Sequence, residues 1–455
     1  MSSRPWTIGI GQRLRLRFWR SPWTLISQVL NNSLLRNSLF IMITTVINSI
    51  FGFIFWLVAA HLFSAHVVGV TAALVSASTI VVLLSTLGVC GMLIQSMPKQ
   101  KSAEGWSITF WAGIATAVIL SLALACGTIF VLPLFVRELD ALHRVSYAAL
   151  FVVTTVAGTV AIILDNVFIA ERAAGNMVIR NTVAAASKFL VVMLLMLLVG
   201  SRALNLLGAW AAASVIGAGF GAFLLIRSMN PLPPSRAAAL IKTALGLRSR
   251  LGGNQLIGMG GALLPYVIPL LVTERLSPSD NAYFYTTWMM AGIFLIISPA
   301  VSLSLFAEGA HSSHELIRKA RAALGVIGAI IAPCLIGVFL AGGIMLSAFG
   351  PAYEHHGVGL LRIALVASFP DAVTNVYVAI LRVQGRLAVA ATLNVSMGVG
   401  IVALSWLFLP ALGISAVGWA FLVMQSCGCI FVAIDLRRTS EAGREVEVPK
   451  HIETT

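Results

Sequence analysis

A row of polar side chains lies within a strongly apolar part of the chain, between residues 359 and 382. Their spacings of three and four residues place them on one side of an α-helix. A carboxylate, an amide and a guanidinium on one face suit the binding of ions and polar groups. The row consists of Ser368, Asp371, Asn375 and Arg382, with the small Ala379 at the intervening position of the same face.

Asp371 is the deepest carboxylate in the sequence. A charged side chain at the centre of a bilayer costs about 2.5–3.5 kcal/mol on insertion scales, so we expect this carboxylate to face protein or water. Two interpretations stay open. Either Asp371 lines a water-filled cavity, or it joins neighbouring helices through hydrogen bonds.

Two weaker polar rows occur earlier in the chain, again at helical spacing. Small and amide side chains of this kind either line a cavity or let helices approach and bond to each other. One row consists of Asn37, Thr44, Asn48 and Gly52, with Arg36 at its end, and the other of Thr154, Thr155, Gly158, Ala161, Asp165 and Asn166.

Lys188 is the only lysine or arginine that falls well inside an apolar segment, which we predict over residues 182–200. This placement puts it about two turns from the helix start. Its side chain either extends to the membrane interface or lines a cavity, where it would meet an anionic group.

The composition indicates that these rows lie in a membrane. Of the 455 residues, 59% are hydrophobic and only 10% are charged. A soluble domain could not bury so much apolar surface. Apolar segments of about 20 residues or more are predicted as transmembrane helices. The twelve segments cover residues 38–60, 67–94, 106–135, 146–170, 182–200, 204–226, 252–273, 283–306, 321–346, 359–381, 387–409 and 412–435.

The formal net charge of +14 reflects topology rather than a nucleic-acid partner. With a cytoplasmic N-terminus and twelve crossings, 24 of the 30 Lys and Arg residues lie on the cytoplasmic side. This distribution follows the positive-inside rule, so we expect a plasma-membrane protein with both termini in the cytoplasm. The basic N-terminal stretch either lies on the anionic inner leaflet or forms a free tail.

A polar connection over 227–250 divides the predicted helices into two groups of six, 38–226 and 251–436, flanked by a basic segment 1–37 and a tail 437–455. The stretch `LFSAHVVGVTAAL` after the first helix corresponds to `LSPSDNAYFYTTW` after the seventh. Six helices are even in number, so both halves have the same orientation. Parallel halves typically enclose a central cavity and rock against each other, as in transporters. We therefore predict an all-α polytopic fold of two pseudo-symmetric six-helix bundles around a cavity.

The seventh predicted helix, `GGNQLIGMGGALLPYVIPLL`, combines glycines with two prolines, which weaken a helix. We expect it to bend and to act as a gate. Close packing is the alternative explanation for the glycines. The expected hinge residues are Gly258, Gly261, Pro265 and Pro269.

The spacing of cysteines and histidines does not support a metal site. All five cysteines fall within apolar segments without ligand spacing. His355 and His356 are neighbours on a short loop and have no convergent third ligand. We predict no catalytic residue, no metal and no cofactor.

Residues 48–88 resemble the opening of bacterial polysaccharide flippases of the multidrug/oligosaccharidyl-lipid/polysaccharide (MOP) exporter superfamily. Their pattern is an Asn-rich first helix followed by Phe-Ser-Pro, acidic residues, an aromatic residue and glycine. Phe63, Ser64 and Gly69 match it. Ala65, His66 and Val68 depart from it, although Ser277, Pro278, Asp280 and Tyr283 restore much of it in the second half.

A second point of resemblance is an amide followed by Arg-x-x-Gly in `NVFIAERAAG` from Asn166, which recurs 209 positions later as `NVYVAILRVQG` from Asn375. We expect the repeated amide to bond helices four and ten together or to bond a sugar. Gly175 and Gly385 are expected to end the two helices. Arg172 and Arg382 would lie near the negative ends of the helix dipoles.

The resemblance implies a transporter rather than an enzyme, similar to O-antigen flippases of the bacterial inner membrane. Such a protein moves a polyprenyl-(di)phosphate-linked saccharide to the outer leaflet for cell-envelope polysaccharide synthesis. It needs no cofactor and draws on a proton or sodium gradient or the membrane potential. The implied partners are the lipid-linked saccharide, membrane lipids and polysaccharide assembly proteins.

A cationic cavity suits a diphosphate. The candidate cations are Arg36, Lys188, Arg250 and Arg382, and the candidate polar and acidic cavity residues are Asn48, Asp165, Asn166, Asn254, Asp371 and Asn375.

Two other functions stay open. A cation-coupled exporter of drugs or small solutes uses the same fold and would favour acidic or aromatic cavity residues. A membrane-embedded glycosyltransferase or polymerase needs a sizeable outer loop with catalytic carboxylates or histidine. The best candidate, `VRELDALHR` over 136–144, resembles an ordinary solvated turn.

Overall fold

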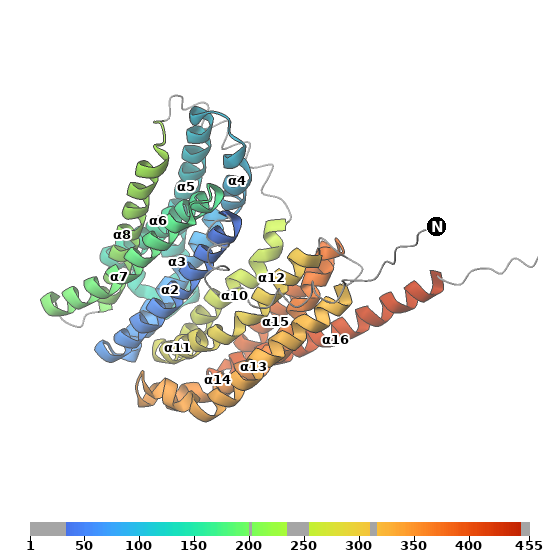
Figure 1. The fold of residues 1–455 in the computed structure, drawn as a ribbon. Helices are drawn as coiled ribbons and strands as arrows, with labels where there is room; N and C mark the ends of the chain where they lie inside the picture. Colours follow the sequence, from blue (N-terminus) through green and yellow to red (C-terminus); the bar gives the residue numbers. More distant parts are fainter. Residues whose placement is uncertain (1–32, 200–202, 234–253, 310–315, 447–455) are drawn as a thin grey trace, which may run out of the picture.

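The computed structural model describes residues 33–199, 203–233, 254–309 and 316–446 (Figure 1). The described residues are almost entirely helical and contain no β-strand. Eleven of their helical segments are long and apolar enough to cross a bilayer. The fold class predicted from the sequence is therefore confirmed: this is an all-α, multi-pass membrane protein.

Helices α2 to α8 form the first bundle, coloured blue to green in Figure 1. Two short 3₁₀ helices, Met97–Lys99 and Arg137–His143, connect its helices. The bundle consists of α2 (Ser33–Leu62), α3 (Ala65–Thr86), α4 (Val89–Ser96), α5 (Ala103–Phe135), α6 (Val145–Ala170), α7 (Ala174–Val199) and α8 (Ala203–Met229).

Helices α10 to α16 form the second bundle, coloured yellow to red. It consists of α10 (Asn254–Arg275), α11 (Pro278–Leu295), α12 (Ile297–Gly309), α13 (Leu316–Ser347), α14 (Pro351–Val383), α15 (Leu387–Leu412) and α16 (Ser415–Val446).

Two predicted segments are each built from two helices. The segment predicted over 67–94 breaks at Gly88, whose φ of 76° ends α3 and begins α4. The segment predicted over 283–306 comprises α11 and α12, which adjoin at Ile296. Hydropathy alone does not detect such breaks because both pieces are equally apolar.

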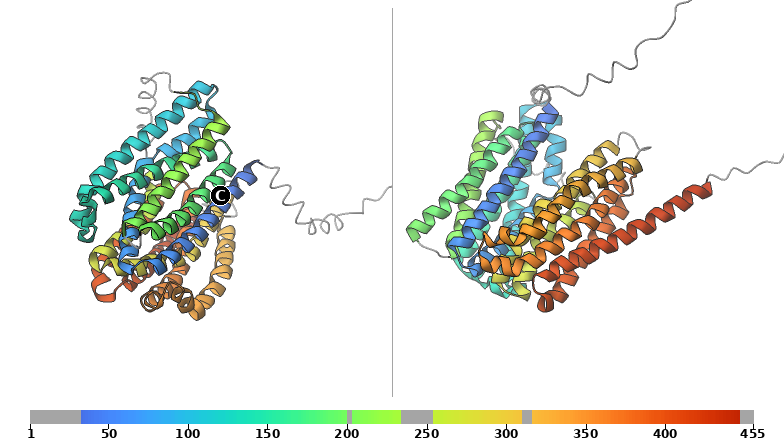
Figure 2. Two further views of the ribbon diagram at one scale, coloured as in Figure 1. Left: turned by 90° about the vertical axis from the view of Figure 1, so that its left-hand side faces the viewer. Right: turned by 60° about the horizontal axis from the view of Figure 1, so that its bottom comes forward.

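The two bundles are in contact at one end of the molecule and diverge towards the other (Figure 1, Figure 2). We call the end that carries the connections 63–64 and 276–277 the closed end. The opposite end, which carries the connections 97–102 and 384–386, is the open end. The contacts between bundles run mainly through α3, which packs against α10 and α11.

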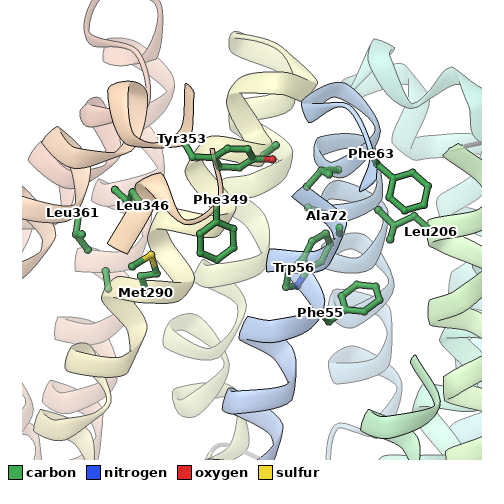
Figure 3. Close-up of a cluster of buried hydrophobic side chains, with 14 of the residues drawn as sticks. Phe55, Trp56, Phe63, Ala72, Leu206, Met290, Leu346, Phe349, Tyr353 and Leu361 are labelled. Carbon is green, nitrogen blue, oxygen red and sulfur yellow. The ribbon is translucent and has the colours of Figure 1, made fainter. Parts of the chain in front are cut away.

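A cluster of buried apolar side chains fills the closed end, with contributions from both bundles (Figure 3). Phe55 and Trp56 of α2 are only 1% and 2% exposed. Phe53 meets Phe349 edge to face at 5.2 Å between ring centroids, and Trp56 lies 4.9 Å from Tyr285. Aromatic pairs of this geometry stabilise a contact beyond the area that they bury. The cluster therefore acts as an apolar plug between the bundles.

A backbone contact reinforces the closed end. The side-chain amide of Asn281 in α11 donates to the carbonyl oxygen of Gly69 in α3, at 2.9 Å and fully buried. A side chain at position 69 would overlap the backbone carbonyl of Pro278. Glycine at this position therefore lets the two bundles touch backbone to backbone.

Helices α6 and α14 end in the same pair of backbone hydrogen bonds, a motif that needs one residue in the left-handed region. That residue is Gly385 in α14, with φ of 73°, as predicted. In α6 the prediction was wrong: Arg172 takes this conformation, with φ of 55°, and Gly175 is already the second residue of α7. The donors of these bonds are Arg172 and Ala173 in α6, and Gly385 and Arg386 in α14.

Equivalent positions in the two bundles are 213 residues apart. The N-cap residues Ser64 and Ser277 differ by this number (277 minus 64), and so do the left-handed residues Arg172 and Gly385. The sequence repeat of Asn166 and Asn375 has an offset of 209 and is thus one helical turn out of register. The two amides are not structural counterparts.

Candidate functional site

A cavity of about 840 Å³ lies between the bundles, on the open side of the apolar plug. Helices α2, α6, α7 and α8 form one wall, and α11 and α13 form the other. The α11 and α13 wall is mostly apolar, with Met289, Ile293 and Ile296 among its residues. The polar side chains of the opposite wall include Asn48, Arg180, Asn181 and Lys188.

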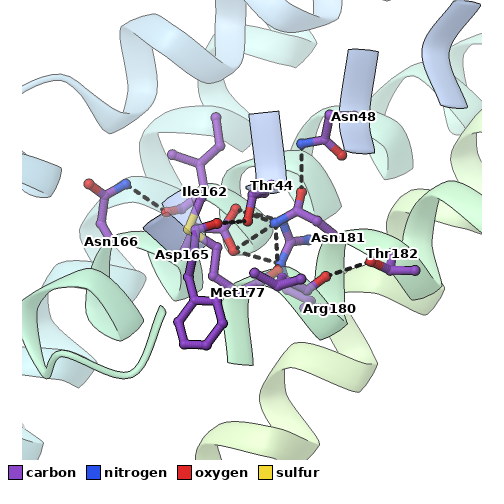
Figure 4. Close-up of polar contacts among 11 residues, drawn as sticks. Thr44, Asn48, Ile162, Asp165, Asn166, Met177, Arg180, Asn181 and Thr182 are labelled. Carbon is purple, nitrogen blue, oxygen red and sulfur yellow. Dashed lines mark hydrogen bonds and ion pairs between the residues drawn. The ribbon is translucent and has the colours of Figure 1, made fainter. Parts of the chain in front are cut away.

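An ion pair organises the polar wall (Figure 4). The guanidinium of Arg180 in α7 donates from Nε and NH2 to the two carboxylate oxygens of Asp165 in α6, at 2.7 and 2.6 Å. Both side chains are largely buried, at 6% and 15% exposed. A bidentate pair fixes the orientation of both groups. The positive charge of Arg180 is thus compensated within the protein.

Two asparagines extend this pair to the cavity surface. Asn181 donates from Nδ2 to Asp165, at 3.1 Å, and accepts from Nδ2 of Asn48 on α2, also at 3.1 Å. The chain of side chains therefore joins α2, α6 and α7. Fully connected networks of this kind hold a site rigid.

Lys188 lies on α7 eight residues beyond Arg180, so both face the same side of the helix. Its Nζ atom lies 3.7 Å from the ring centroid of Trp210 on α8, a cation–π contact. Among the described residues, no carboxylate forms an ion pair with it. Lys188 is therefore a cation of the cavity wall whose charge no acidic side chain in the described part of the chain compensates.

The position of Lys188 decides between the two sequence interpretations. Helix α7 begins at Ala174, eight residues before the predicted start, so Lys188 lies near the middle of the helix. Its side chain lines the cavity instead of extending to the interface. The helix starts early because the cap of α6 places Arg172 and Ala173 in a tight turn.

The sequence prediction missed Arg180 and Asn181 because it placed both in a loop before the helix. Both are buried within α7, at 5% and 8% exposed. A signal was present: positions 180, 184 and 188 follow at intervals of four, the period of a helix face. Trp210 was also missed, since a lone tryptophan in an apolar segment carries no spacing signal.

Asp371 is not among the residues that line this cavity. It is 7% exposed within the second bundle, where Nε2 of Gln425 on α16 donates to its carboxylate at 3.1 Å. The hydroxyl of Thr374 donates in turn to the side-chain oxygen Oε1 of Gln425, at 2.7 Å. The carboxylate therefore joins α14 and α16.

The repeated asparagines bond within their own helices. Asn166 donates to the carbonyl oxygen of Ile162, at 2.8 Å, and Asn375 to that of Asp371, at 3.0 Å. The expected bond between the fourth and tenth predicted helices is therefore not formed. The reason is that an amide can satisfy itself on the carbonyl four residues earlier.

The remaining predicted site residues lie away from the cavity wall or cannot be placed. Arg36 is exposed near the start of α2, and Arg382 is half-buried in the last turn of α14. Arg250 lies outside the described residues. Asn254, Gly258 and Gly261 belong to α10, but their side chains are outside the described part.

Helix α10 is continuous from Asn254 to Arg275 and includes Pro265 and Pro269. The two prolines therefore do not interrupt it. A gating role for this helix stays a prediction.

Metal-binding side chains do not cluster in the part of the chain that the structure describes. His355 and His356 are exposed on the first turns of α14, and His356 stacks on Tyr283 at 4.7 Å between ring centroids.

No protein-family model matches this sequence, and no curated protein matches it in sequence. Solved structures do match its fold. An inward-facing multidrug resistance MATE family transporter of the MOP superfamily covers 92% of this chain and 100% of its own, with a TM-score of 0.70 and 14% identity. The chain has the MOP transporter fold. Because the sequence identity is only 14%, this similarity is evidence for the fold alone.

Two further structures with the MOP fold allow a comparison of state. The lipid II flippase MurJ, in an inward closed conformation, matches with a TM-score of 0.69 and 10% identity over 88% of this chain and 87% of its own. An outward-facing MATE family transporter matches with a TM-score of only 0.54, at 14% identity over 92% of this chain and 98% of its own. The bundles are thus arranged more like those of the inward-facing neighbour.

Proposed function

We propose that this protein is a flippase that moves a polyprenyl-(di)phosphate-linked saccharide from the inner to the outer leaflet of the bacterial plasma membrane. The open end would face the cytoplasm, in agreement with the distribution of basic residues. Rocking of the two bundles would then close the open end and separate the bundles at the apolar plug of the closed end.

The observation that supports an anionic substrate is the uncompensated charge of Lys188. Arg180 is neutralised by Asp165, so Lys188 leaves the polar wall with a net positive charge. A buried cation attracts a phosphate strongly because little water screens it. The volume of about 840 Å³ is within the range of sites that enclose a ligand of moderate size.

The likeness to a MATE family transporter keeps a drug exporter as the second candidate. The aromatic side chains Phe53, Trp56 and Tyr285 next to the apolar wall would favour a hydrophobic solute. An uncompensated lysine disfavours a cationic drug, however, because like charges repel in a desolvated site. The two candidates therefore differ in the charge of the substrate.

Replacing Lys188 by glutamine is expected to weaken substrate binding about 10- to 100-fold, the effect of losing one charged hydrogen bond. Lys188→Arg retains the charge and is expected to retain most of the activity. The measurement is the movement of a short-chain polyprenyl-diphosphate saccharide between leaflets of proteoliposomes, with a cationic dye as the second substrate.

The outcome separates the two candidates. Loss of saccharide movement in Lys188→Gln, with Lys101→Gln, an exposed lysine outside the cavity, as an unaffected control, supports the flippase. Faster dye export by Lys188→Gln, with no saccharide movement by the wild type, would refute it.

We propose a proton or sodium gradient or the membrane potential as the energy source, with Asp371 as the group that senses it. An ionisable side chain buried within a membrane bundle is usually retained for function. Asp371→Asn keeps the shape but removes the charge, so we expect transport to slow about tenfold or more while the binding of substrate is unchanged. The measurement is the initial rate with and without an imposed gradient. A variant that responds to the gradient as the wild type does would contradict this role.

A further inference from the structure

A second hollow lies on the outside of the second bundle, between α15 and α16. It has a volume of about 470 Å³ and shares no residue with the central cavity. Its base is formed by buried side chains, Leu393 and Met397, and by Gly428. Exposed residues of small or moderate size, Thr392, Ser396 and Cys427, line its opening. It is thus a surface groove that faces the surrounding lipid.

The groove is long and narrow. It follows α15 from Arg386 to Met397, eleven residues, which corresponds to about 16 Å along a helix. At one end Gly428 lets α16 approach α14 and α15 closely, since a side chain there would meet Thr374 and Met397. A groove of this shape suits one extended hydrocarbon chain.

The other end of the groove is held by a charged cluster. Arg386 donates from NH1 and NH2 to the two carboxylate oxygens of Asp435, at 2.8 and 2.9 Å. The hydroxyl of Tyr377 on α14 donates to the same carboxylate. This bracing fixes the distance between the start of α15 and α16, and therefore the width of the groove.

Positive charge gathers at this end of the groove. Among the residues whose side chains the structure describes, one aspartate lies there with several arginines. Arg437 and Arg438 are exposed and follow the pocket residue Asp435 by two and three positions. Basic side chains at the membrane surface attract anionic lipids. The arginines are Arg382, Arg386, Arg437 and Arg438.

We propose that this groove binds an anionic glycerophospholipid, with one acyl chain between α15 and α16 and the phosphate at the arginine cluster. The site is separate from the central cavity, so its occupant is a lipid of the membrane rather than the transported substrate. An uncharged or zwitterionic lipid would fill the groove without using the arginines.

The test uses the full-length protein in nanodiscs that contain a trace of photoactivatable lipid. Phosphatidylglycerol and phosphatidylcholine, each with a diazirine on one acyl chain, are compared, and labelled peptides are identified by mass spectrometry. We expect phosphatidylglycerol to label the groove residues Thr392, Ser396, Cys427 and Phe431 about fivefold more than phosphatidylcholine does, about the effect of one surface arginine.

Two matched variants test whether the acyl chain of the lipid lies in the groove. Thr392→Trp fills the groove and is expected to remove most of this labelling. Val395→Trp places the same side chain on an exposed face of α15 outside the groove and is expected to leave the labelling unchanged. Arg437→Gln with Arg438→Gln should reduce the preference for phosphatidylglycerol.

Three results would overturn the proposal. Equal labelling by the two lipids would exclude recognition of charge. Labelling at Val395 and Val399 as strong as inside the groove would exclude a specific site. Displacement of the label by a polyprenyl phosphate, and not by excess phosphatidylglycerol, would assign the groove to the lipid carrier instead.

Discussion

Replacing Asp165 by alanine is expected to lower the free energy of unfolding by about 3–5 kcal/mol, the cost of leaving one member of a buried ion pair unpaired. Arg180 is 5% exposed and would keep its charge in an environment with little water. Asn181 would also lose its contact with Asp165, so the link between α6 and α2 would be broken. The measurement is reversible unfolding in mixed micelles.

The double variant Asp165→Leu with Arg180→Met is the control. It removes both charges and fills a similar volume, so most of the lost stability should return. The matched single control is Asp140→Asn, because Asp140 is exposed and outside the membrane core. A loss below about 1 kcal/mol in Asp165→Ala would show that water reaches Arg180 freely and that the pair does not hold the bundle together.

Replacing Gly69 by alanine is expected to separate the bundles at the closed end. The added Cβ would overlap the carbonyl of Pro278, and a backbone atom cannot rotate away as a side chain can. Overpacking costs about 1–3 kcal/mol, and loss of the bond from Asn281 adds about 0.5–1.5 kcal/mol. We therefore expect the closed arrangement to become less populated by at least about tenfold, and transport to fall with it.

The measurement is the distance between spin labels at positions 66 and 355, in a variant without other cysteines. These positions lie at the starts of α3 and α14, in different bundles at the closed end. Gly127→Ala is the control, because a Cβ at that position meets no atom within 4 Å. Asn281→Ala should give a smaller shift, since it removes the hydrogen bond but causes no overlap. An unchanged distance in Gly69→Ala would show that α3 and α11 slide past each other at no cost.

Several features of this fold follow from local patterns in the sequence. The apolar segments predict where the spans lie, although α7 and α14 begin eight residues before their predicted starts. The pattern is informative because a helix in lipid must be long enough to cross it and must satisfy its own backbone. Ser277 is a residue type that favours a helix start, and its hydroxyl accepts from the backbone N–H of Asp280 at 3.1 Å, although the predicted segment began only at 283. Gly385 predicts a helix end because few other residues adopt a positive φ readily.

The sequence alone did not predict which positions of the two halves are equivalent. The similar stretches at Asn166 and Asn375 suggested an offset of 209, whereas the backbone has an offset of 213. Apolar helices resemble one another at every turn, so a shift of four residues changes the alignment without changing the pattern. Only the positions of the helix caps fix the true correspondence.

The composition and hydropathy of the chain determined by themselves that it is an all-helical membrane protein. The tertiary structure alone decided which polar residues form the site. Asp165 and Arg180 meet because α6 and α7 pack with particular faces together, which leaves Lys188 as the cation without an acidic partner among the described residues. Asp371 has the same local signature as Asp165, yet the rotation of α14 directs it towards Gln425. The rotation of a helix about its axis depends on contacts between segments that are distant in the sequence. It therefore cannot be predicted from the spacing of residues within that helix.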